Sequence, residues 1–392
     1  MKTRDFDVVV IGAGLAGLQV SRMLGESGLH VLLVDRKPSL DKSVHTTGIF
    51  VRRTLEDFSF PEDCLGPPVR DVTLYSPARR AIEFASPHDE FRVGRMGLLY
   101  QRFLESAIRA GVEWMPDTQF VEHAKEKDRC VVRLNRRGLA LEVRTGYLVG
   151  ADGARSRVAA ALCLDENREW IVGVEEVLEN IPLEGRPRFH CFLDPGLAPG
   201  YLAWAVHDGE QVHIGVGGYA ARFDPVKALR EFRASLDQLL DLSKARLIER
   251  RGGRIPVGGV LPQIANTEGL LIGDAAGAVS PLTAGGLDPC MRLSSYAARV
   301  IPAYLRSRDP NALRGYSGEL FRARFVSRLW MRRAIAGVES RALMELGCAL
   351  FRLPGFYSFA RHVFFGRGSF PDVGPDSSAN AVLRLNQQES RI

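Results

Sequence analysis

Three glycines spaced as Gly-x-Gly-x-x-Gly separate a short β-branched segment from an apolar helical pattern near the N-terminus. In such a strand–turn–helix unit, Gly12 permits a tight turn, Gly14 lets the backbone approach a pyrophosphate, and Gly17 lets the helix pack closely on the strand. Asp35 ends the next predicted strand, where a carboxylate can accept hydrogen bonds from ribose hydroxyls. This segment therefore predicts a dinucleotide site, and by itself it does not separate FAD from NAD. The residues expected against the dinucleotide are Gly12, Gly14, Leu15, Ala16, Gly17, Asp35 and Arg36.

Two acidic motifs follow predicted strands later in the chain. Asp152 lies in Leu-Val-Gly-Ala-Asp-Gly at 148–153, and Gly273 and Asp274 lie in Leu-Leu-Ile-Gly-Asp-Ala-Ala-Gly at 270–277. An acid at the carboxyl edge of a strand can bind a hydroxyl or orient a water, and small residues after Asp274 let a helix N-terminus face phosphate oxygens. Either motif alone also fits a capped turn. The three motifs in this order indicate a long, extended dinucleotide, which favours FAD.

The order of the patterns predicts an α/β fold. A Rossmann-like FAD-binding domain is interrupted by strands that alternate with Pro and Gly clusters, which is typical of an inserted β-sheet domain. We assign residues 1–75, 91–168 and 255–300 to the FAD-binding domain, 169–254 to a sheet-rich substrate domain and 301–392 to a C-terminal helical segment. Gly215 to Gly218 has no helical pattern or distal acid after it, so a separate NAD(P)H domain is not predicted.

The composition excludes several classes of protein. The six cysteines show no CxxC spacing, which argues against a disulfide scaffold and fits a reducing cytoplasm. His190, His207 and His213 lack metal-ligand spacing, so we predict no metal site. No signal peptide is visible, and no apolar run reaches the roughly 18 residues that span a bilayer. We expect a cytoplasmic protein that binds no nucleic acid, and the oligomeric state is left open.

Positive charge is concentrated at the C-terminus. Residues 301–392 contain 14 Arg and no Lys against 7 acidic residues. Within 318–334 an apolar row and a basic row each repeat every four residues: Phe321, Phe325 and Leu329, and Arg324, Arg328 and Arg332. A helix of this kind suits packing on the FAD-binding domain or peripheral binding at the inner face of a membrane, where charge attraction would dominate. A solvated basic face is the third interpretation.

At these three motifs the chain resembles the glutathione-reductase-type FAD proteins of the aromatic-hydroxylase superfamily, from about residue 6 to 320. The resemblance implies that the glycine turn and Asp35 bind the ADP half of FAD and that Asp274 binds the ribityl-pyrophosphate region. It also implies flavin contacts for Arg95, in Val-Gly-Arg-Met at 93–96, and an adenine contact for the backbone of Phe120. The residues that it places beside the flavin ring are Pro281, Gly285, Gly286 and Leu287.

Within the superfamily, the segment Ser-Pro-Leu-Thr-Ala-Gly-Gly-Leu at 280–287 resembles the geranylgeranyl reductases, which saturate isoprenoid double bonds. Residues 199–204 with 215–217, and 253–259, resemble other motifs of those enzymes. The chain departs from them at 45–48, where His-Thr-Thr-Gly replaces a Cys-Gly-Gly cluster, and at 205–207, where Ala-Val-His follows the Trp. The aromatic hydroxylases carry His where this chain has Gly277.

Three side chains are candidates for the reaction itself. His45 is a candidate proton donor beside the flavin, and the alternative is a polar loop residue. Tyr201 and Trp204 are candidate substrate contacts. Because they lie three apart on a predicted strand, we expect them to face opposite sides of the sheet, one toward the cavity and one toward the core.

The resulting hypothesis is an FAD-dependent oxidoreductase that reduces carbon–carbon double bonds of a small apolar, isoprenoid-like substrate, with NAD(P)H or a reduced electron carrier as donor. The first alternative is a flavin monooxygenase or halogenase that acts on an aromatic or polyketide-like molecule. Against a halogenase, the expected Trp-x-Trp-x-Ile-Pro run is absent around Trp204. A third alternative is a protein that uses FAD only as a structural element or docks a partner through its basic C-terminal helices.

Overall fold

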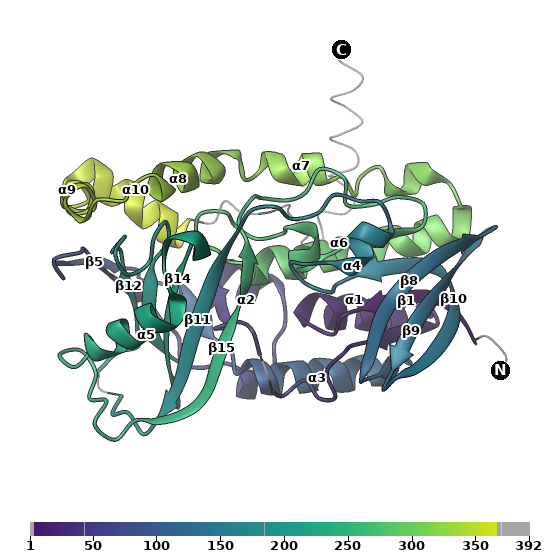
Figure 1. Ribbon diagram of the computed structural model, residues 1–392, viewed down its shortest axis with the longest axis horizontal. Coiled ribbons are helices and arrows are strands. Elements are labelled where there is room, and N and C mark those ends of the chain that lie inside the picture. The colour runs from purple at the N-terminus through teal and green to yellow at the C-terminus, as the bar shows by residue number, and fades with distance from the viewer. Residues whose placement is uncertain (1–3, 43, 184, 367–369, 371–392) are drawn as a thin grey trace, which may run out of the picture.

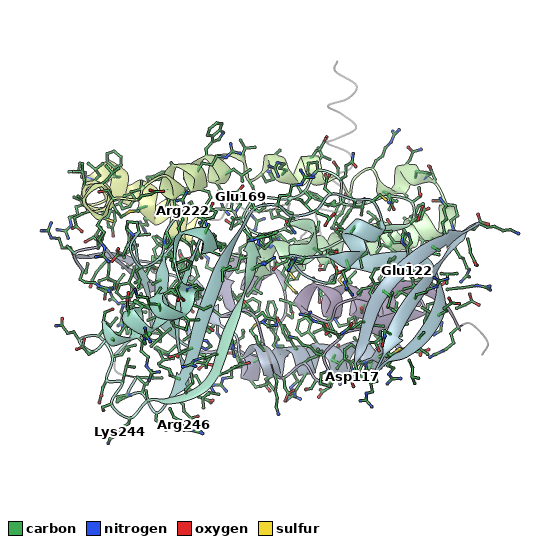
Figure 2. All side chains as sticks on the ribbon, in the orientation of Figure 1. Asp117, Glu122, Glu169, Arg222, Lys244 and Arg246 are labelled. Carbon is green, nitrogen blue, oxygen red and sulfur yellow. The ribbon has the colours of Figure 1, made fainter. Side chains whose placement is uncertain are left out.

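The computed structural model describes residues 4–42, 44–183, 185–366 and 370. Two sheets occupy opposite ends of the molecule, and the C-terminal helices run along one side of both (Figure 1). Charged side chains such as Glu122 and Arg246 project from the outer faces of the two sheets (Figure 2). The predicted α/β architecture, with a Rossmann-type domain, a second sheet and C-terminal helices, is confirmed.

The first sheet contains a parallel part and an antiparallel part, joined by one long strand. The parallel order is β7-β2-β1-β10-β16, and the first half of β10 also pairs antiparallel with β9, which pairs with β8. Val8, Val9 and Val10 are fully buried, so both faces of the sheet are covered. The strands are β1 (Arg4–Ile11), β2 (Val31–Val34), β7 (Glu113–Met115), β8 (Thr118–Glu126), β9 (Arg129–Arg136), β10 (Leu139–Gly150) and β16 (Gly269–Leu271).

Helices cover this sheet and form the hydrophobic core with it. The first of them packs against two others, and its buried face includes Leu18, Val20 and Leu24. The helical elements of this part are α1 (Leu15–Glu26), α2 (Arg52–Asp57), α3 (Met96–Arg109), α4 (Arg157–Ala161) and α6 (Leu287–Ser307), with the short turns η1 (Glu62–Cys64), η3 (Gly273–Ala276) and η4 (Pro310–Leu313).

The second sheet has the order β15-β11-β14-β13-β12-β4-β5 and is antiparallel except where β12 pairs with β4. One helix covers one face through the buried Leu229 and Phe232. The elements are β4 (Asp71–Tyr75), β5 (Ala81–Ala85), β11 (Trp170–Glu179), β12 (Arg188–Phe192), β13 (Ala203–His207), β14 (Val212–Gly218), β15 (Arg246–Pro256), α5 (Pro225–Ala234) and η2 (Ala220–Arg222). A small pair, β3 (Ile49–Val51) with β6 (Phe91–Val93), connects the two regions.

The β4–β5 hairpin differs from the domain boundaries that the sequence suggested. Residues 71–75 were assigned to the FAD-binding domain, but β4 pairs with β12 in the second sheet, in register from Asp71 opposite Arg188 to Tyr75 opposite Phe192. The strand follows directly from the first domain in the chain, and only a partner more than 100 residues away reveals where it belongs.

Between residues 301 and 366 the C-terminal segment is mostly helical, as predicted, and of the residues after 366 only Phe370 is described. The single helix expected over 318–334 is divided. It forms α7 (Gly318–Ala323) and α8 (Val326–Ala336), with the break at Arg324 and Phe325, and is followed by α9 (Arg341–Leu350) and α10 (Pro354–Phe365). Phe321 and Phe325 are buried as the packing interpretation requires. Arg332 is buried as well, so the expected continuous basic face does not form. Among the described residues, no helix is long and apolar enough to cross a membrane.

Candidate functional site

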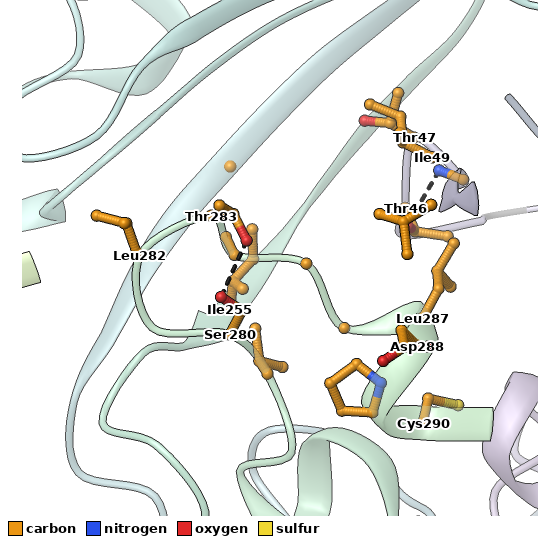
Figure 3. A pocket seen from close by; sticks show the side chains of 18 of the residues that line it. Thr46, Thr47, Ile49, Ile255, Ser280, Leu282, Thr283, Leu287, Asp288 and Cys290 are labelled. Atoms are coloured by element: carbon orange, nitrogen blue, oxygen red, sulfur yellow. Dashed lines mark hydrogen bonds between the residues drawn. The ribbon is translucent and has the colours of Figure 1, made fainter. Parts of the chain in front are cut away.

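A cavity of about 750 Å³ is lined by both sheets and by the C-terminal helices. Its walls include the glycine turn after β1, residues 45–53, parts of β11 and β13, residues 272–290, and side chains of α8 and α10. Figure 3 shows the loop that carries Ser280, Leu282 and Thr283 across from Thr46 and Thr47. The hydroxyl of Thr283 donates to Ser280 Oγ at 2.9 Å and holds this loop in shape. A mostly apolar cavity of this size with a few polar groups is typical of a cofactor or ligand site.

The three motif glycines have different roles in the structure. A Cβ on Gly12 would overlap the carbonyl oxygen of Ala151, and one on Gly17 would overlap the carbonyl oxygen of Gly12. Gly12 also has φ of +105°, which L side chains rarely adopt. Gly14 lines the cavity, and a Cβ there would meet no atom within 4 Å. Gly12 and Gly17 are thus required by the fold, whereas the space at Gly14 is free for a ligand.

Asp35 supports the glycine turn from the next strand. Its carboxylate accepts hydrogen bonds from the backbone N–H of Ala13 at 2.7 Å and of Lys37 at 2.9 Å, and it lines the cavity. Leu15 and Ala16 line the cavity too, whereas Arg36 is exposed and is not part of the lining. The predicted ribose contact of Asp35 stays a prediction.

The second acid, Asp152, is engaged within its own turn. Its carboxylate accepts hydrogen bonds from Ser156 Oγ at 2.6 Å and from the backbone N–H of Arg157 at 2.7 Å. Its neighbours Ala151 and Gly153 line the cavity, but Asp152 does not. The contacts of Asp152 are those of the capped turn that the sequence left open, and a direct contact with the cofactor stays a prediction.

The third acid, Asp274, lines the cavity as Asp35 does. Burial raises the pKa of its carboxyl group to about 6. In the described part of the chain its carboxylate accepts no hydrogen bond, so it is available to a ligand hydroxyl. Gly273, Gly285, Gly286 and Leu287 line the same wall.

Three other predicted contacts lie behind the lining. Pro281 falls between cavity residues without reaching the cavity itself. Arg95 also lies outside the lining, and its guanidinium pairs with Glu210 at 2.8 Å. Phe120 is buried, and its carbonyl accepts a hydrogen bond from Arg157 Nη1 at 3.3 Å. Their contacts with the cofactor stay predictions.

His45 lines the cavity beside β15 of the second sheet. Its Nδ1 lies 3.1 Å from the carbonyl oxygen of Gly252. Burial and the nearby Lys37 lower its pKa, so the ring carries a proton less readily near neutral pH than a free histidine does. That direction works against the proton-donor role that the sequence suggested for it.

The expectation that Tyr201 and Trp204 face opposite sides of a strand is wrong. Tyr201 lies in the bend before β13, so strand alternation does not apply to it, and both side chains line the cavity. Their rings meet edge to face at 6.5 Å. Tyr201 Oη donates to the carbonyl oxygen of Thr283 at 2.7 Å, which ties this wall to the 280–286 loop.

A buried charged cluster, which was not predicted from the sequence, lies beside Trp204. Trp204 Nε1 donates to Glu175 Oε2 at 3.0 Å, and Thr47 Oγ1 donates to the same oxygen. Glu175 Oε1 lies 3.2 Å from His213 Nδ1 and 3.5 Å from Arg251 Nη1. Glu175 and His213 are almost fully buried, and Glu175 lines the cavity. The cluster therefore holds one wall of the cavity through Trp204 and the loop at Thr47.

Charge pairing within the cluster favours the ionised forms of Glu175 and His213. Burial alone would lower the pKa of His213, but Glu175 and Asp208 outweigh it and raise this pKa to about 9. Burial opposes ionisation of Glu175, but His213, Thr47 and Arg251 outweigh it and lower its pKa. A signal was present in the sequence, namely an acid and a histidine within apolar strands, but their pairing depends on the register of β11 with β14.

Two family models match this chain. One, described as pyridine nucleotide-disulphide oxidoreductase, matches residues 6–173, and the other, described as FAD binding domain, matches residues 97–252. The chain is an FAD-dependent oxidoreductase. Its glycine turn, open at Gly14, and the unpartnered Asp274 fit FAD. The predicted superfamily and the likeness to the geranylgeranyl reductases are confirmed.

Curated relatives of this oxidoreductase match most of its length. Digeranylgeranylglycerophospholipid reductase 3 of Methanosphaera stadtmanae is 26% identical over 79% of this chain and 80% of that relative. Geranylgeranyl diphosphate reductase of Rhodobacter capsulatus is also 26% identical, over 79% of this chain and 78% of that relative.

Solved structures resemble the oxidoreductase in fold. A geranylgeranyl bacteriochlorophyll reductase-like protein of Thermoplasma acidophilum has a TM-score of 0.81 at 19% identity and covers 93% of this chain and 98% of its own. A p-nitrophenol 4-monooxygenase of Pseudomonas putida has a TM-score of 0.69 at 16% identity, with 98% of each chain covered. Reductases and monooxygenases thus share this fold, and the fold alone does not choose between their reactions.

The contrast between the motif glycines gives a first prediction. Gly14→Val should abolish FAD binding yet leave the fold intact, because its side chain fills ligand space. Gly17→Ala should instead lower the melting temperature, because its methyl group overlaps the carbonyl oxygen of Gly12. Flavin absorbance of the purified variants and circular dichroism melting separate the two effects. A Gly14→Val protein that retains full flavin would overturn this assignment.

The charged cluster gives a second prediction. Because the folded pKa of His213 lies above its unfolded value near 6.5, its stabilisation is complete below pH 6.5 and is lost as the pH rises through 9. The free energy of unfolding of the wild type should fall across this range by on the order of 1–3 kcal/mol more than that of a Glu175→Gln/His213→Gln variant.

Urea unfolding at pH 6.5, 8 and 9.5 measures this difference. His190→Gln is the matched control, because burial lowers the pKa of His190 to about 4 and keeps it neutral across the range. If the free energy of unfolding has the same pH dependence in the wild type and the double variant, pairing of charged Glu175 and His213 does not stabilise the fold.

Proposed function

We propose that this oxidoreductase reduces carbon–carbon double bonds of an apolar, isoprenoid-like substrate. The observation that carries the proposal is the apolar extension of the FAD cavity toward the C-terminal helices. Aromatic and aliphatic side chains of that region line it: Phe351, Phe359, Val363, Phe364 and Phe365. A long hydrocarbon chain gains its binding energy from such a surface. The names of the relatives, which specify geranylgeranyl compounds for those proteins, support the same substrate class.

Reduced FAD, when bound, would supply a hydride to one alkene carbon, and a protein group or water would supply the proton for the other carbon. The protein itself shapes the site and excludes water from it. Trp204 and Tyr201 form one wall, and the Glu175 cluster fixes Trp204 through its indole N–H. The C-terminal helices exclude water from the reacting carbons. The electron donor proposed for the cofactor is NAD(P)H or a reduced carrier.

A third prediction tests the reaction type. Under anaerobic conditions, the reduced holoenzyme should be reoxidised by geranylgeraniol, and mass spectrometry should detect a gain of two hydrogens per double bond. The Gly14→Val variant is the control for flavin dependence.

Two other outcomes identify the alternatives. An oxygenated product that forms only in air, with substrate-dependent oxygen consumption, would identify a monooxygenase. Reoxidation by neither substrate nor oxygen, with FAD fully retained, would identify a protein that uses FAD as a structural element.

We also propose that the C-terminal helices bind the surface of a membrane. Their outward side chains are unusually apolar: Trp330, Leu343, Leu346, Leu350, Leu353, Phe356 and Phe359 are each at least 39% exposed. Phe359 also lines the cavity, so this surface adjoins the apolar extension. Two arginines of the predicted basic row instead face the interior, since Arg328 donates to Ser280 Oγ at 3.1 Å and Arg332 is buried. Apolar insertion is therefore the main attraction, and charge is secondary.

A fourth prediction follows for vesicle binding. The wild type should sediment with vesicles that contain anionic lipid at low salt and should remain partly bound at high salt, because apolar contacts are not screened. Leu346→Asp/Phe356→Asp should lose this binding. Val226→Asp is the matched control, since Val226 is 71% exposed on α5, away from the C-terminal helices. Absence of the wild type from every pellet at low salt would contradict the proposal.

A further inference from the structure

Arg332 is a buried cation on the cavity wall. Only 1% of its surface is exposed, and it lines the cavity from α8. Its Nε and Nη2 atoms are buried without a hydrogen-bond partner among the described residues, and no described carboxylate forms an ion pair with it. Other buried arginines of the chain are paired: Arg292, for example, contacts Asp57 at 2.6 Å and Asp288 at 2.9 Å.

The surroundings of Arg332 compensate its charge only in part. The guanidinium carbon lies 5.2 Å from the ring centre of Tyr201 and 5.3 Å from that of Tyr219. Such cation–π contacts stabilise a cation by about 0.5–2 kcal/mol, whereas removing a charge from water costs several kcal/mol. An uncompensated cation in a cavity wall is therefore expected to meet an anion when the cavity is filled.

The position of Arg332 separates it from the cofactor phosphates. Its two aromatic neighbours belong to residues 199–219 of the second sheet, whereas the open glycine turn at Gly14 belongs to the first sheet. On the same helix, Met331, Ala334 and Ile335 line the cavity with apolar side chains. A ligand at this wall thus meets one cation within an apolar surface, which suits an amphiphile with a charged head and a hydrocarbon chain.

We propose that Arg332 binds the anionic phosphate head of the substrate. The inference rests on the proposed function for the apolar chain and adds the head group and the residue that recognises it. A guanidinium binds phosphate oxygens through paired N–H donors, and the rings of Tyr201 and Tyr219 lie beside the guanidinium of Arg332. Tyr201 in turn donates to Thr283 in the 280–286 loop, so the head group is anchored next to the loop expected beside the flavin.

Calorimetry of the FAD-loaded enzyme with geranyl phosphate and with geraniol tests this proposal, because the two ligands differ only in the head group. The wild type should bind geranyl phosphate more tightly than geraniol. Arg332→Gln should weaken the binding of geranyl phosphate about 10- to 100-fold, which is the loss expected for a charge-assisted hydrogen bond. It should leave the affinity for geraniol unchanged. Arg333→Gln should change neither affinity, since Arg333 is exposed on the same helix and its guanidinium carbon lies 5.4 Å from the ring centre of Trp330.

Three results would overturn the assignment. Equal weakening of both ligands by Arg332→Gln would make Arg332 a packing residue. Equal affinity of the wild type for inorganic phosphate and geranyl phosphate would indicate a free-anion site instead of a head-group site. A changed flavin reduction potential in Arg332→Gln, with the preference for geranyl phosphate retained, would assign the cation to the flavin.

Arg332→Lys keeps the test decisive if the Gln variant does not fold. The Lys variant retains the charge without the planar fork, so it should keep a reduced preference for geranyl phosphate over geraniol. A Lys variant that binds the two ligands equally well would contradict charge recognition at this position. Calorimetry measures binding without turnover. A negative result in the alkene-reduction assay and a loss of head-group recognition can therefore be told apart.

Discussion

The contact between the glycine turn and the strand beside it determines where everything else in this molecule can lie. Gly12 approaches Ala151 at the end of β10, and Gly17 approaches Gly12 itself, so closely that a methyl group on either glycine would overlap a carbonyl oxygen. This approach brings β1, α1 and β10 into one compact corner. Asp35 then holds the turn through the N–H of Ala13, and the third motif adds Asp274 to the same edge. The floor of the cavity is therefore set by backbone packing, and the space at Gly14 is left for a ligand.

The sequence predicted this part of the site well because its signals are local. A glycine before a helix, or an acid at the end of a strand, constrains its neighbours within a few residues. The acids show the limit of that reasoning, since Asp152 and Asp274 have similar contexts but only Asp274 faces the cavity. Whether a carboxylate caps its own turn or serves a ligand depends on contacts such as that with Ser156, which the motif does not encode.

The remaining wall depends on partners far apart in the chain, and there the sequence was a poorer guide. Strand alternation misplaced Tyr201 because the chain bends before β13 begins. The pairing of Glu175 with His213 arises from the register of two strands, and the burial of Arg332 arises from the path of the C-terminal segment. A basic row at helical spacing looked like a surface feature. Instead, Arg328 donates to Ser280 Oγ, and Arg332 is buried beside the rings of Tyr201 and Tyr219.

The position of the β4–β5 hairpin has a consequence for how the molecule holds together. Residues 71–85 lie in the chain between strands of the first sheet, yet they form the edge of the second. The backbone therefore passes from one sheet to the other and back before the main inserted segment begins at β11. Neither sheet is a continuous piece of chain, so neither can be excised whole by two cuts. Movement of the two sheets away from each other would therefore strain the connections at both crossings. Unfolding of one sheet should also unfold the other, in a single cooperative transition.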